Sequence, residues 1–235
     1  MAEVKNNGVI TLSLGITNCF LIPAGDNYLL VDTAHITYYS KFKQELEYKA
    51  IKLTQIKFIF LTHHHQDHTG FLADLLEESG ATLIAHQKAL PFLEQGINNP
   101  DMTGTTSLIR FLMKPQKFFA TKNVNKKVVP GKNAFIIDSD DDTFLREQGI
   151  AAKIISLPAH TNDSIALIFD NGDSFIGDAA MNILLFMGLK NRPLVAENSI
   201  DLKNCWSKIK NENGKTLFVS HGKPLNIDVL MKRIF

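Results

Sequence analysis

The stretch from Leu61 to Gly70, which reads Leu-Thr-His-His-His-Gln-Asp-His-Thr-Gly, constrains this chain more than any other. It places four potential metal ligands within six positions: His63, His65, Asp67 and His68. The preceding run, Ile56 to Leu61, is β-branched and aromatic and predicts a buried strand, and the residues from Gly70 onward predict a helix. The cluster is therefore expected on a strand-to-helix loop, whose rigid ends can direct several imidazoles at one point.

The composition is that of a globular protein without electrostatic bias. The 235 residues are 45% hydrophobic and 21% charged, which suits one large domain with a substantial core. Because Lys plus Arg (25) nearly equals Asp plus Glu (24), we expect neither a nucleic-acid nor a membrane partner. The apolar run Ile183–Leu189 is far shorter than the roughly 20 residues that span a bilayer. Met1–Gly8 lacks the apolar core of a signal peptide, and we expect a cytoplasmic protein.

Short apolar runs and turn residues organise the first half of the chain. The predicted elements are strands at Val9–Leu14, Cys19–Ile22, Tyr28–Val31 and Ala81–Ala85, and helices at Tyr38–Leu53 and Phe71–Ser79. The first three strands are expected to form an antiparallel meander, and Gly80 is expected to end the second helix. Asp32, directly after the third strand, could simply cap a turn. His35 is expected in a loop, and His86 is expected to be a structural histidine.

The segment from about residue 91 to 130 differs from its surroundings and is predicted to be a helical insertion or lid. Asn98-Asn99-Pro100 is expected to break one helix, and Ser107–Met113 is expected to form another. No acidic residue occurs between Met102 and Ile137, whereas the segment contains the basic residues Arg110, Lys114, Lys117, Lys122, Lys126 and Lys127. These either attract an anionic substrate or form a solvated face. Four carboxylates then fall within Asp138–Asp142, without the glycine and terminal glutamate of an EF-hand loop, and predict a polar hairpin turn.

Three more potential ligands in the second half each follow an apolar run. Strands are predicted at Ala152–Leu157, Ser164–Phe169, Ser174–Ile176 and Leu217–Ser220. His160 stands in the tight connection between the first two, Asp178 follows the third, and His221 follows the fourth. Each alone could be a capping aspartate or a turn histidine. Their recurrence at strand ends favours a shared site, because open sheets gather functional groups there.

The histidine and aspartate side chains named above are numerous enough to bind zinc ions. His63 and His65 alternate along an extended backbone, so they face the same side and can bind one ion together. His160 would complete that set, Asp67, His68 and His221 would bind a second ion, and Asp178 could bridge both. Cys19 and Cys205 are too few for a disulfide framework and too far apart in sequence for a thiolate metal motif. Both are expected to be buried.

The ordered motifs resemble the metallo-β-lactamase fold superfamily: Asp32, then His63-x-His65-x-Asp67-His68, His160, Asp178 and His221. The resemblance spans residues 32 to 221 and implies an α/β fold, a four-layer αββα sandwich, with residues 1–235 as a single domain. It implies the same division of the seven ligands between two metals, with Asp67 and Asp178 in catalytic positions and Asp32 as a support for the ligand loops. Ala159 stands where many members have glycine, and alanine would be strained there if the position needs a positive φ.

The resemblance implies a zinc-dependent hydrolase with two divalent ions, zinc having manganese or iron as alternatives. A metal-bridging hydroxide would attack a small ester, thioester or lactone, and the apolar segment Met181–Val195 could wall the substrate pocket or belong to the core. Alternatives are an iron-dependent redox enzyme, a phosphodiesterase and, as the weakest, a non-catalytic binding module that would have lost ligands. The expected partner is a small-molecule substrate, and a homodimer is left open.

Overall fold

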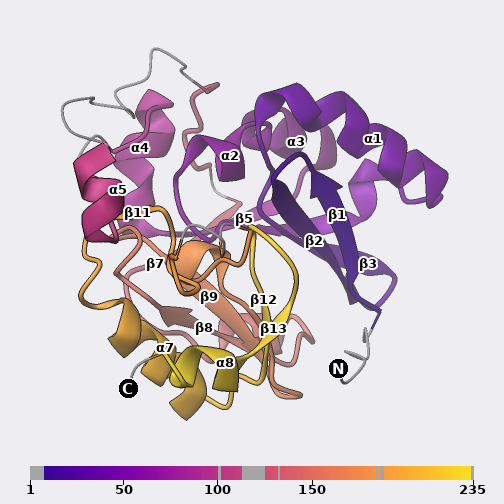
Figure 1. Cartoon of the computed structure of the whole chain (residues 1–235). Coiled ribbons are helices and arrows are strands. Elements are labelled where there is room, and N and C mark those ends of the chain that lie inside the picture. Colours follow the sequence, from indigo (N-terminus) through magenta and orange to yellow (C-terminus); the bar gives the residue numbers. More distant parts are fainter. Residues whose placement is uncertain are drawn as a thin grey trace. The chain divides into compact units, whose positions relative to one another are not determined.

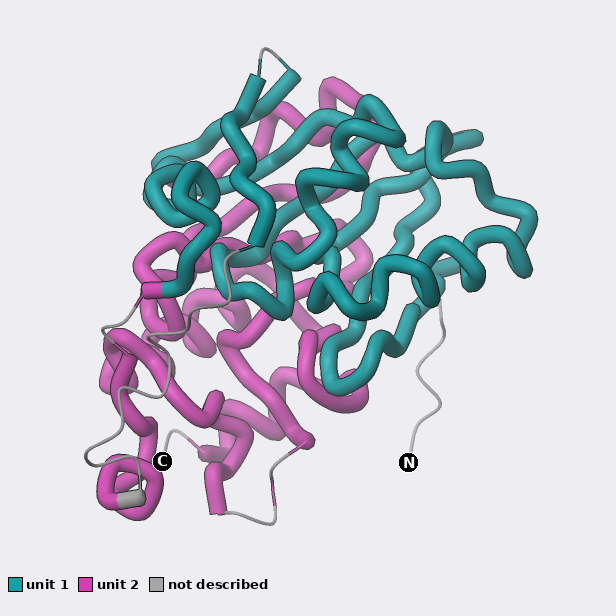
Figure 2. Tube along the Cα trace, turned by 90° about the horizontal axis from the view of Figure 1, so that it is seen from above, with its two compact units in different colours: residues 1–98, 122–138 teal, residues 99–121, 139–235 magenta. Residues whose placement is uncertain are grey.

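The computed structural model describes residues 8–99, 102–112, 125–131, 133–183, 185 and 188–233. The chain forms two compact units, which Figure 2 distinguishes by colour. Unit 1 comprises residues 1–98 and 122–138, and unit 2 comprises residues 99–121 and 139–235. Both contain a sheet and helices, so the predicted α/β class is confirmed. That the whole chain acts as one domain stays a prediction.

Unit 1 contains a six-stranded sheet in the order β1-β2-β3-β4-β5-β7. Its strands are β1 (Ile10–Leu14), β2 (Thr17–Ala24), β3 (Asn27–Val31), β4 (Ile56–Phe60), β5 (Thr82–His86) and β7 (Ala134–Ile137). The first three form the predicted antiparallel meander, and β3, β4, β5 and β7 pair in parallel. Since the carboxyl ends of parallel strands meet at one edge, Asp32 after β3 and the histidine stretch after β4 lie at the same edge of the sheet.

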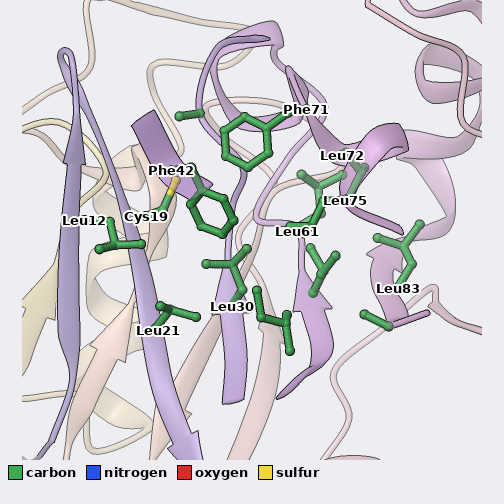
Figure 3. Packing of buried hydrophobic residues seen from close by; sticks show 14 of the residues in the cluster. Leu12, Cys19, Leu21, Leu30, Phe42, Leu61, Phe71, Leu72, Leu75 and Leu83 are labelled. Atoms are coloured by element: carbon green, nitrogen blue, oxygen red, sulfur yellow. The ribbon is translucent and has the colours of Figure 1, made fainter. Parts of the chain in front are cut away.

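The helical elements of unit 1 are η1 (Ile36–Tyr38), α1 (Tyr39–Tyr48), η2 (Leu53–Gln55), α2 (Gln66–Thr69), α3 (Leu72–Ser79), η3 (Gln87–Ala89) and α4 (Leu90–Gln95). Helix α3 ends at Gly80, which adopts the left-handed conformation (φ 67°) as predicted. In the core, the rings of Phe42 and Phe71 lie 4.9 Å apart above apolar side chains of the sheet such as Leu30 (Figure 3). This packing fixes the helices on both sides of the histidine stretch.

Unit 2 contains a five-stranded sheet in the order β13-β12-β10-β9-β8, and a two-stranded sheet of β6 and β11 (Figure 1). The strands are β6 (Thr103–Gly104), β8 (Ala152–Ser156), β9 (Ile165–Phe169), β10 (Asp173–Phe175), β11 (Val195–Ala196), β12 (Thr216–Phe218) and β13 (Leu225–Asn226). The helical elements are α5 (Ser107–Leu112), α6 (Phe144–Glu147), η4 (Gly177–Ala179), α7 (Leu202–Asn211) and α8 (Ile227–Met231). Trp206 of α7 is fully buried, and its indole donates to the carbonyl of Ala179, which ties η4 to the core.

Two sequence-based predictions about the connections were wrong. Strands β7 and β8 belong to different sheets, so Asp138–Asp142 does not form a hairpin turn. Instead, the carboxylate of Asp141 accepts from the backbone N–H groups of Thr143 and Phe144 (3.1 and 2.9 Å), a local contact that aspartate makes readily. Helix α4 ends at Gln95, before the predicted break at Asn98-Asn99-Pro100, of which Pro100 lies outside the described residues, because Gly96 (φ 69°) supplies a left-handed cap.

The predicted insertion is described only in part. Helix α5 confirms the predicted helix from Ser107, whereas Met113, Lys114, Lys117 and Lys122 lie outside the described residues. Lys126 pairs with Asp74 of α3. A role of the lysines in substrate attraction stays a prediction. Within the described ranges no helix has the length and apolar character needed to cross a bilayer, and the cytoplasmic location stays a prediction.

Candidate functional site

The first part of the site follows strand β4 in unit 1. His63 is buried, and its Nδ1 lies 3.0 Å from the hydroxyl of Thr62. Its Nε2 lies 3.0 Å from Nδ1 of His65. The two rings therefore converge, as the alternation of these residues along an extended backbone requires. Two imidazole nitrogens this close together could bind one cation between them.

Asp67 and His68 lie on the short helix α2, not on an irregular loop. His68 is fully buried, and its Nδ1 lies 2.8 Å from Oδ2 of Asp32. The same Asp32 carboxylate accepts from the backbone N–H (2.9 Å) and the hydroxyl (2.8 Å) of Thr62. Asp32 has a φ of 59°, a conformation that aspartate tolerates better than most residues. Asp32 thus links two ligand-bearing segments and directs Nε2 of His68 away from itself.

Two asparagines hold helix α2 from outside. The side-chain oxygen of Asn98 accepts from the backbone N–H of Gln66 (2.9 Å). The amide of Asn125 donates to the hydroxyl of Thr69 (2.9 Å). These residues lie on either side of the segment in which the chain belongs to unit 2. The ligand helix is therefore anchored where the chain leaves unit 1 and where it returns.

The other histidines of unit 1 have structural roles. His64 is buried, and its ring stacks on Phe92 with centroids 3.9 Å apart and an interplanar angle of 13°. Its side chain is therefore used in packing. Nδ1 of His35 accepts from the N–H of Thr37, and Nδ1 of His86 caps η3 (Gln87–Ala89) in the same manner.

In unit 2, three potential ligands meet around one carboxylate oxygen. Nε2 of His160 lies 3.5 Å and Nε2 of His221 lies 3.3 Å from Oδ2 of Asp178. All three residues are buried. His160 lies in the β8–β9 connection, as predicted, while Asp178 and His221 follow the parallel strands β10 and β12. Parallel pairing brings the latter two to one edge of the sheet, where the carboxylate can serve two imidazole-bound ions.

The donor set fits divalent metal ions. Nδ1 of His63, His68 and His160 lies against an oxygen in each case (Thr62 Oγ1, Asp32 Oδ2 and the carbonyl of Val195, 2.9 Å), so Nε2 is the nitrogen that each ring could offer to a metal. Metal-binding histidines typically have such a partner on the second nitrogen. Histidine and carboxylate ligands accept zinc, manganese or iron.

The cysteines and Ala159 raise no conflict with this donor set. Cys19 and Cys205 are buried, as predicted, and burial raises the pKa of both thiols, to about 12 for Cys205. Neither is poised as a thiolate ligand. Ala159 is not among the non-glycine residues of positive φ in the described part of the chain, so the alanine is unstrained in place of glycine.

Sequence reasoning missed the segment that holds the His160 loop. The backbone N–H of Glu197 donates to the carbonyl of His160 (2.9 Å), and that of Asn198 donates to the carbonyl of Ala159 (2.9 Å). The Glu197 carboxylate accepts from the N–H of Asn162 (3.0 Å) and from the side chain of Asn99 (2.6 Å). No spacing in the sequence indicates these contacts, which join residues 35 or more positions apart.

Comparisons with known proteins agree with these motifs. The family model described as Metallo-beta-lactamase superfamily matches residues 12–221. Hydroxyacylglutathione hydrolase of Pelagibacter ubique is 25% identical over 162 residues, which are 67% of this chain and 52% of the relative. The probable metallo-hydrolase YqjP of Bacillus subtilis is 22% identical over 229 residues, 90% of this chain and 69% of the relative.

A shorter match and a solved structure complete the comparison. A putative diflavin flavoprotein of Synechocystis is 31% identical over 84 residues, 35% of this chain and 14% of that protein. This chain thus spans about half or less of the length of some curated relatives it matches. The crystal structure of an archaeal metallo-beta-lactamase superfamily protein from Sulfolobus tokodaii superposes with a TM-score of 0.64 at 15% identity, covering 97% of this chain and 84% of that one. The fold is therefore shared.

Proposed function

We propose that this chain, which belongs to the metallo-beta-lactamase superfamily, is a metal-dependent hydrolase of a small ester, thioester or lactone. One observation carries the proposal: in unit 2, a single carboxylate oxygen of Asp178 faces Nε2 of both His160 and His221. A buried carboxylate that lies between two imidazoles could act as a bridging ligand between two cations. The pair His63 and His65 in unit 1 offers the same kind of donors.

We propose the following division of the ligands, which rests on the family membership. One ion would be held by His63, His65 and His160, the other by Asp67, His68 and His221, and Asp178 would be shared. Two such ions would lower the pKa of a shared water and polarise the attacked carbonyl group. Zinc is the proposed native metal, because it takes nitrogen and carboxylate ligands and leaves a position for water.

Two aspartates of the chain would orient the reacting groups and accept or hold protons. The Asp67 side chain is 35% exposed whereas that of His68 is fully buried, so Asp67 can reach both the water and the solvent. We assign to it the orientation of the water or the acceptance of its proton. Asp32 keeps the proton of His68 on Nδ1 and thereby the ring in its orientation.

An acyl substrate of partly apolar character is supported by two observations. One relative at low identity is a hydrolase of hydroxyacylglutathione, an acylated small molecule. In this chain, Ile183 and Leu185 follow Asp178 and are 41% and 48% exposed, so part of the Met181–Val195 segment is available to a ligand. Met181, Leu189 and Val195 are buried and belong to the core.

The test couples metal content to activity. The purified protein is assayed against a panel of small esters, thioesters, lactones and phosphodiesters before and after chelation. We expect about two metal ions per chain, hydrolysis of a carbonyl substrate, loss of that activity on chelation and its return with zinc or manganese. Hydrolysis that persists after complete metal removal would refute the mechanism, and hydrolysis of only the phosphodiester would refute the substrate class.

A redox function is the second candidate, because a stretch of the chain is similar to a putative diflavin flavoprotein. Histidine and carboxylate ligands also bind iron. Elemental analysis of protein produced with both metals supplied distinguishes the two functions. Iron at about two per chain with oxygen-consuming activity, and no hydrolysis in the panel, would favour the redox enzyme.

A further inference from the structure

In unit 2, the chain after Asp178 runs beside the chain that carries His221. Strands β10 and β12 pair in parallel, and the ladder continues past both strand ends. The N–H of Ile176 donates to the carbonyl of Phe218 (3.1 Å), and the N–H of Ser220 donates to the carbonyl of Gly177 (3.3 Å). The backbones that present the two ligands are therefore in register up to the ligands themselves.

Asn182 closes this ladder beyond the ligands. Its backbone N–H donates to the carbonyl of His221 (3.0 Å). Its side-chain amide donates to the carbonyl of Lys223 and accepts from the N–H of Lys223 (2.8 Å). An asparagine amide offers one acceptor and two donors, so here it takes the place of a peptide group in a strand pair. One residue thus holds the backbone on both sides of Gly222.

The contact between Asn182 and the His221 loop requires a glycine at position 222. Its φ is 128°, a conformation that residues with a side chain rarely adopt. A Cβ at this position would lie 1.8 Å from Oδ1 of Asn182. The His221–Lys223 backbone can therefore approach Asn182 only with glycine between its two hydrogen-bonded residues.

We propose that Asn182 is a positioning residue for His221: by holding the His221 backbone, Asn182 keeps Nε2 of His221 directed at Oδ2 of Asp178. This inference rests on the proposed two-metal function and adds to it a residue that does not touch a metal. Ligands must be held within about 0.5 Å of their productive geometry. A loosened His221 loop would therefore lower the affinity for one of the two ions selectively. The ion assigned to His63, His65 and His160 has no ligand on this loop and depends less on it.

The test measures metal binding in Asn182→Ala and Asn182→Ser. Metal-depleted protein is titrated with zinc, and with cobalt to follow the ligand-field spectrum of each site. We expect wild type to bind two ions and both variants to bind the ion assigned to His221 about 10- to 100-fold less tightly, as for other residues that orient metal ligands, while binding of the other ion is unchanged. A residue needed only for folding would weaken both ions together.

Asn191→Gly is the matched control in the same loop. Asn191 accepts from the N–H of Met181 through its carbonyl (3.0 Å) and has a φ of 69°, which glycine adopts without strain. Within the described part of this loop its hydrogen bonds are with Met181 and not with the His221 loop, so both ions should bind as in wild type.

The possible outcomes separate the two proposals. If wild type binds two ions and both Asn182 variants bind them with wild-type affinities, the positioning role is refuted. If wild type binds no metal, the proposed function itself fails. Circular dichroism establishes that each variant is folded, and if Asn182→Ala is not, Asn182→Ser, which keeps a small polar side chain, decides the question.

Discussion

The two groups of candidate ligands are built in different ways. In unit 1, His63, His65, Asp67 and His68 come from six consecutive positions, so most of their geometry is set by a short piece of backbone. In unit 2, His160, Asp178 and His221 come from three strand ends that are up to 61 positions apart, and sheet register brings them together. The first group therefore depends on residues that support one loop, and the second on long-range contacts that align several.

The largest effect is expected at Asp178, the residue proposed to bind both ions. Asp178→Ala removes the oxygen that faces His160 and His221, so it should lower metal content towards zero. Losing several kcal/mol of transition-state stabilisation corresponds to a fall in kcat/KM on the order of 10³-fold or more. Metal analysis and steady-state kinetics measure both. A variant that retains two ions and wild-type kcat/KM would show that Asp178 is not shared.

A smaller effect is expected from the support residue of unit 1. Asp32→Ala leaves Nδ1 of His68 and two donors of Thr62 without their acceptor, so the ligand stretch loosens. We expect metal affinity to fall about 10- to 100-fold while the protein still folds. Zinc titration measures this, with Thr62→Ser as a control that preserves the hydroxyl. Equal affinity of Asp32→Ala and wild type would show that the stretch holds its geometry unaided.

The corresponding support residue in unit 2 should matter less. Glu197→Ala removes the carboxylate that accepts from Asn162 and Asn99, but its backbone contact with His160 remains. A loss of up to about 10-fold in metal affinity is expected, at the low end for residues that orient ligands. The measurement is the same zinc titration, with Glu197→Gln, which keeps one acceptor, as the matched control. A loss larger than that of Asp32→Ala would reverse the ranking of the two units.

His64 tests whether position within the ligand stretch is sufficient for function. Because its ring stacks on Phe92 and is buried, His64→Ala should lower the free energy of unfolding by about 1–3 kcal/mol through lost packing. Metal content and kcat should stay within about 3-fold of wild type, in contrast to His63→Ala. Denaturant unfolding and kinetics provide the two measurements, and loss of a metal ion from the folded His64→Ala protein would contradict the assignment.

The smallest effect concerns exposed ion pairs. Two hydrogen bonds from Arg146 hold the pKa of Asp170 below its ordinary 3.8. Because the folded pKa is the lower one, the pair's stabilisation is present above the unfolded pKa and is lost as the pH falls through the folded value. Arg146→Ala should therefore flatten the acid side of the Tm–pH curve slightly.

Lys126→Ala provides the matched comparison in unit 1. There Asp74 raises the pKa of the lysine, so the lysine's contribution is present below its unfolded pKa and is lost as the pH rises through the folded value. Thermal unfolding should therefore reveal the effect of Arg146→Ala between pH 2.5 and 7, and an effect of Lys126→Ala at the alkaline end. Identical acid-side curves for wild type and Arg146→Ala would show that the Arg146 pair does not stabilise the fold.

The sequence correctly predicted those features that are determined by neighbouring residues. The β-branched run before the histidine stretch became β4, Gly80 ended α3, and the alternation of His63 and His65 matches their converging rings. These features depend on neighbours a few positions away, which propensity and periodicity capture.

The features that the sequence did not predict depend on contacts between residues far apart in the chain. Asn182 contacts His221 39 positions later, and Glu197 holds His160 37 positions earlier. The acidic run Asp138–Asp142 was predicted to be a hairpin because composition indicates a turn but not which sheet the next strand joins. Side chains that support a ligand loop carry no spacing pattern of their own, so only the folded chain identifies them.

Asn98 and Asn125 bear on how this protein could be re-engineered. Because both asparagines bind helix α2, the segment between them is not a freely exchangeable cassette, although it begins and ends close to the boundaries of unit 1. A graft that replaces residues 99–121 with the corresponding segment of a relative should retain both asparagines. Splice points placed inside residues 98–125 would keep both asparagine contacts, whereas splice points outside them would remove contacts that hold the helix of Asp67 and His68.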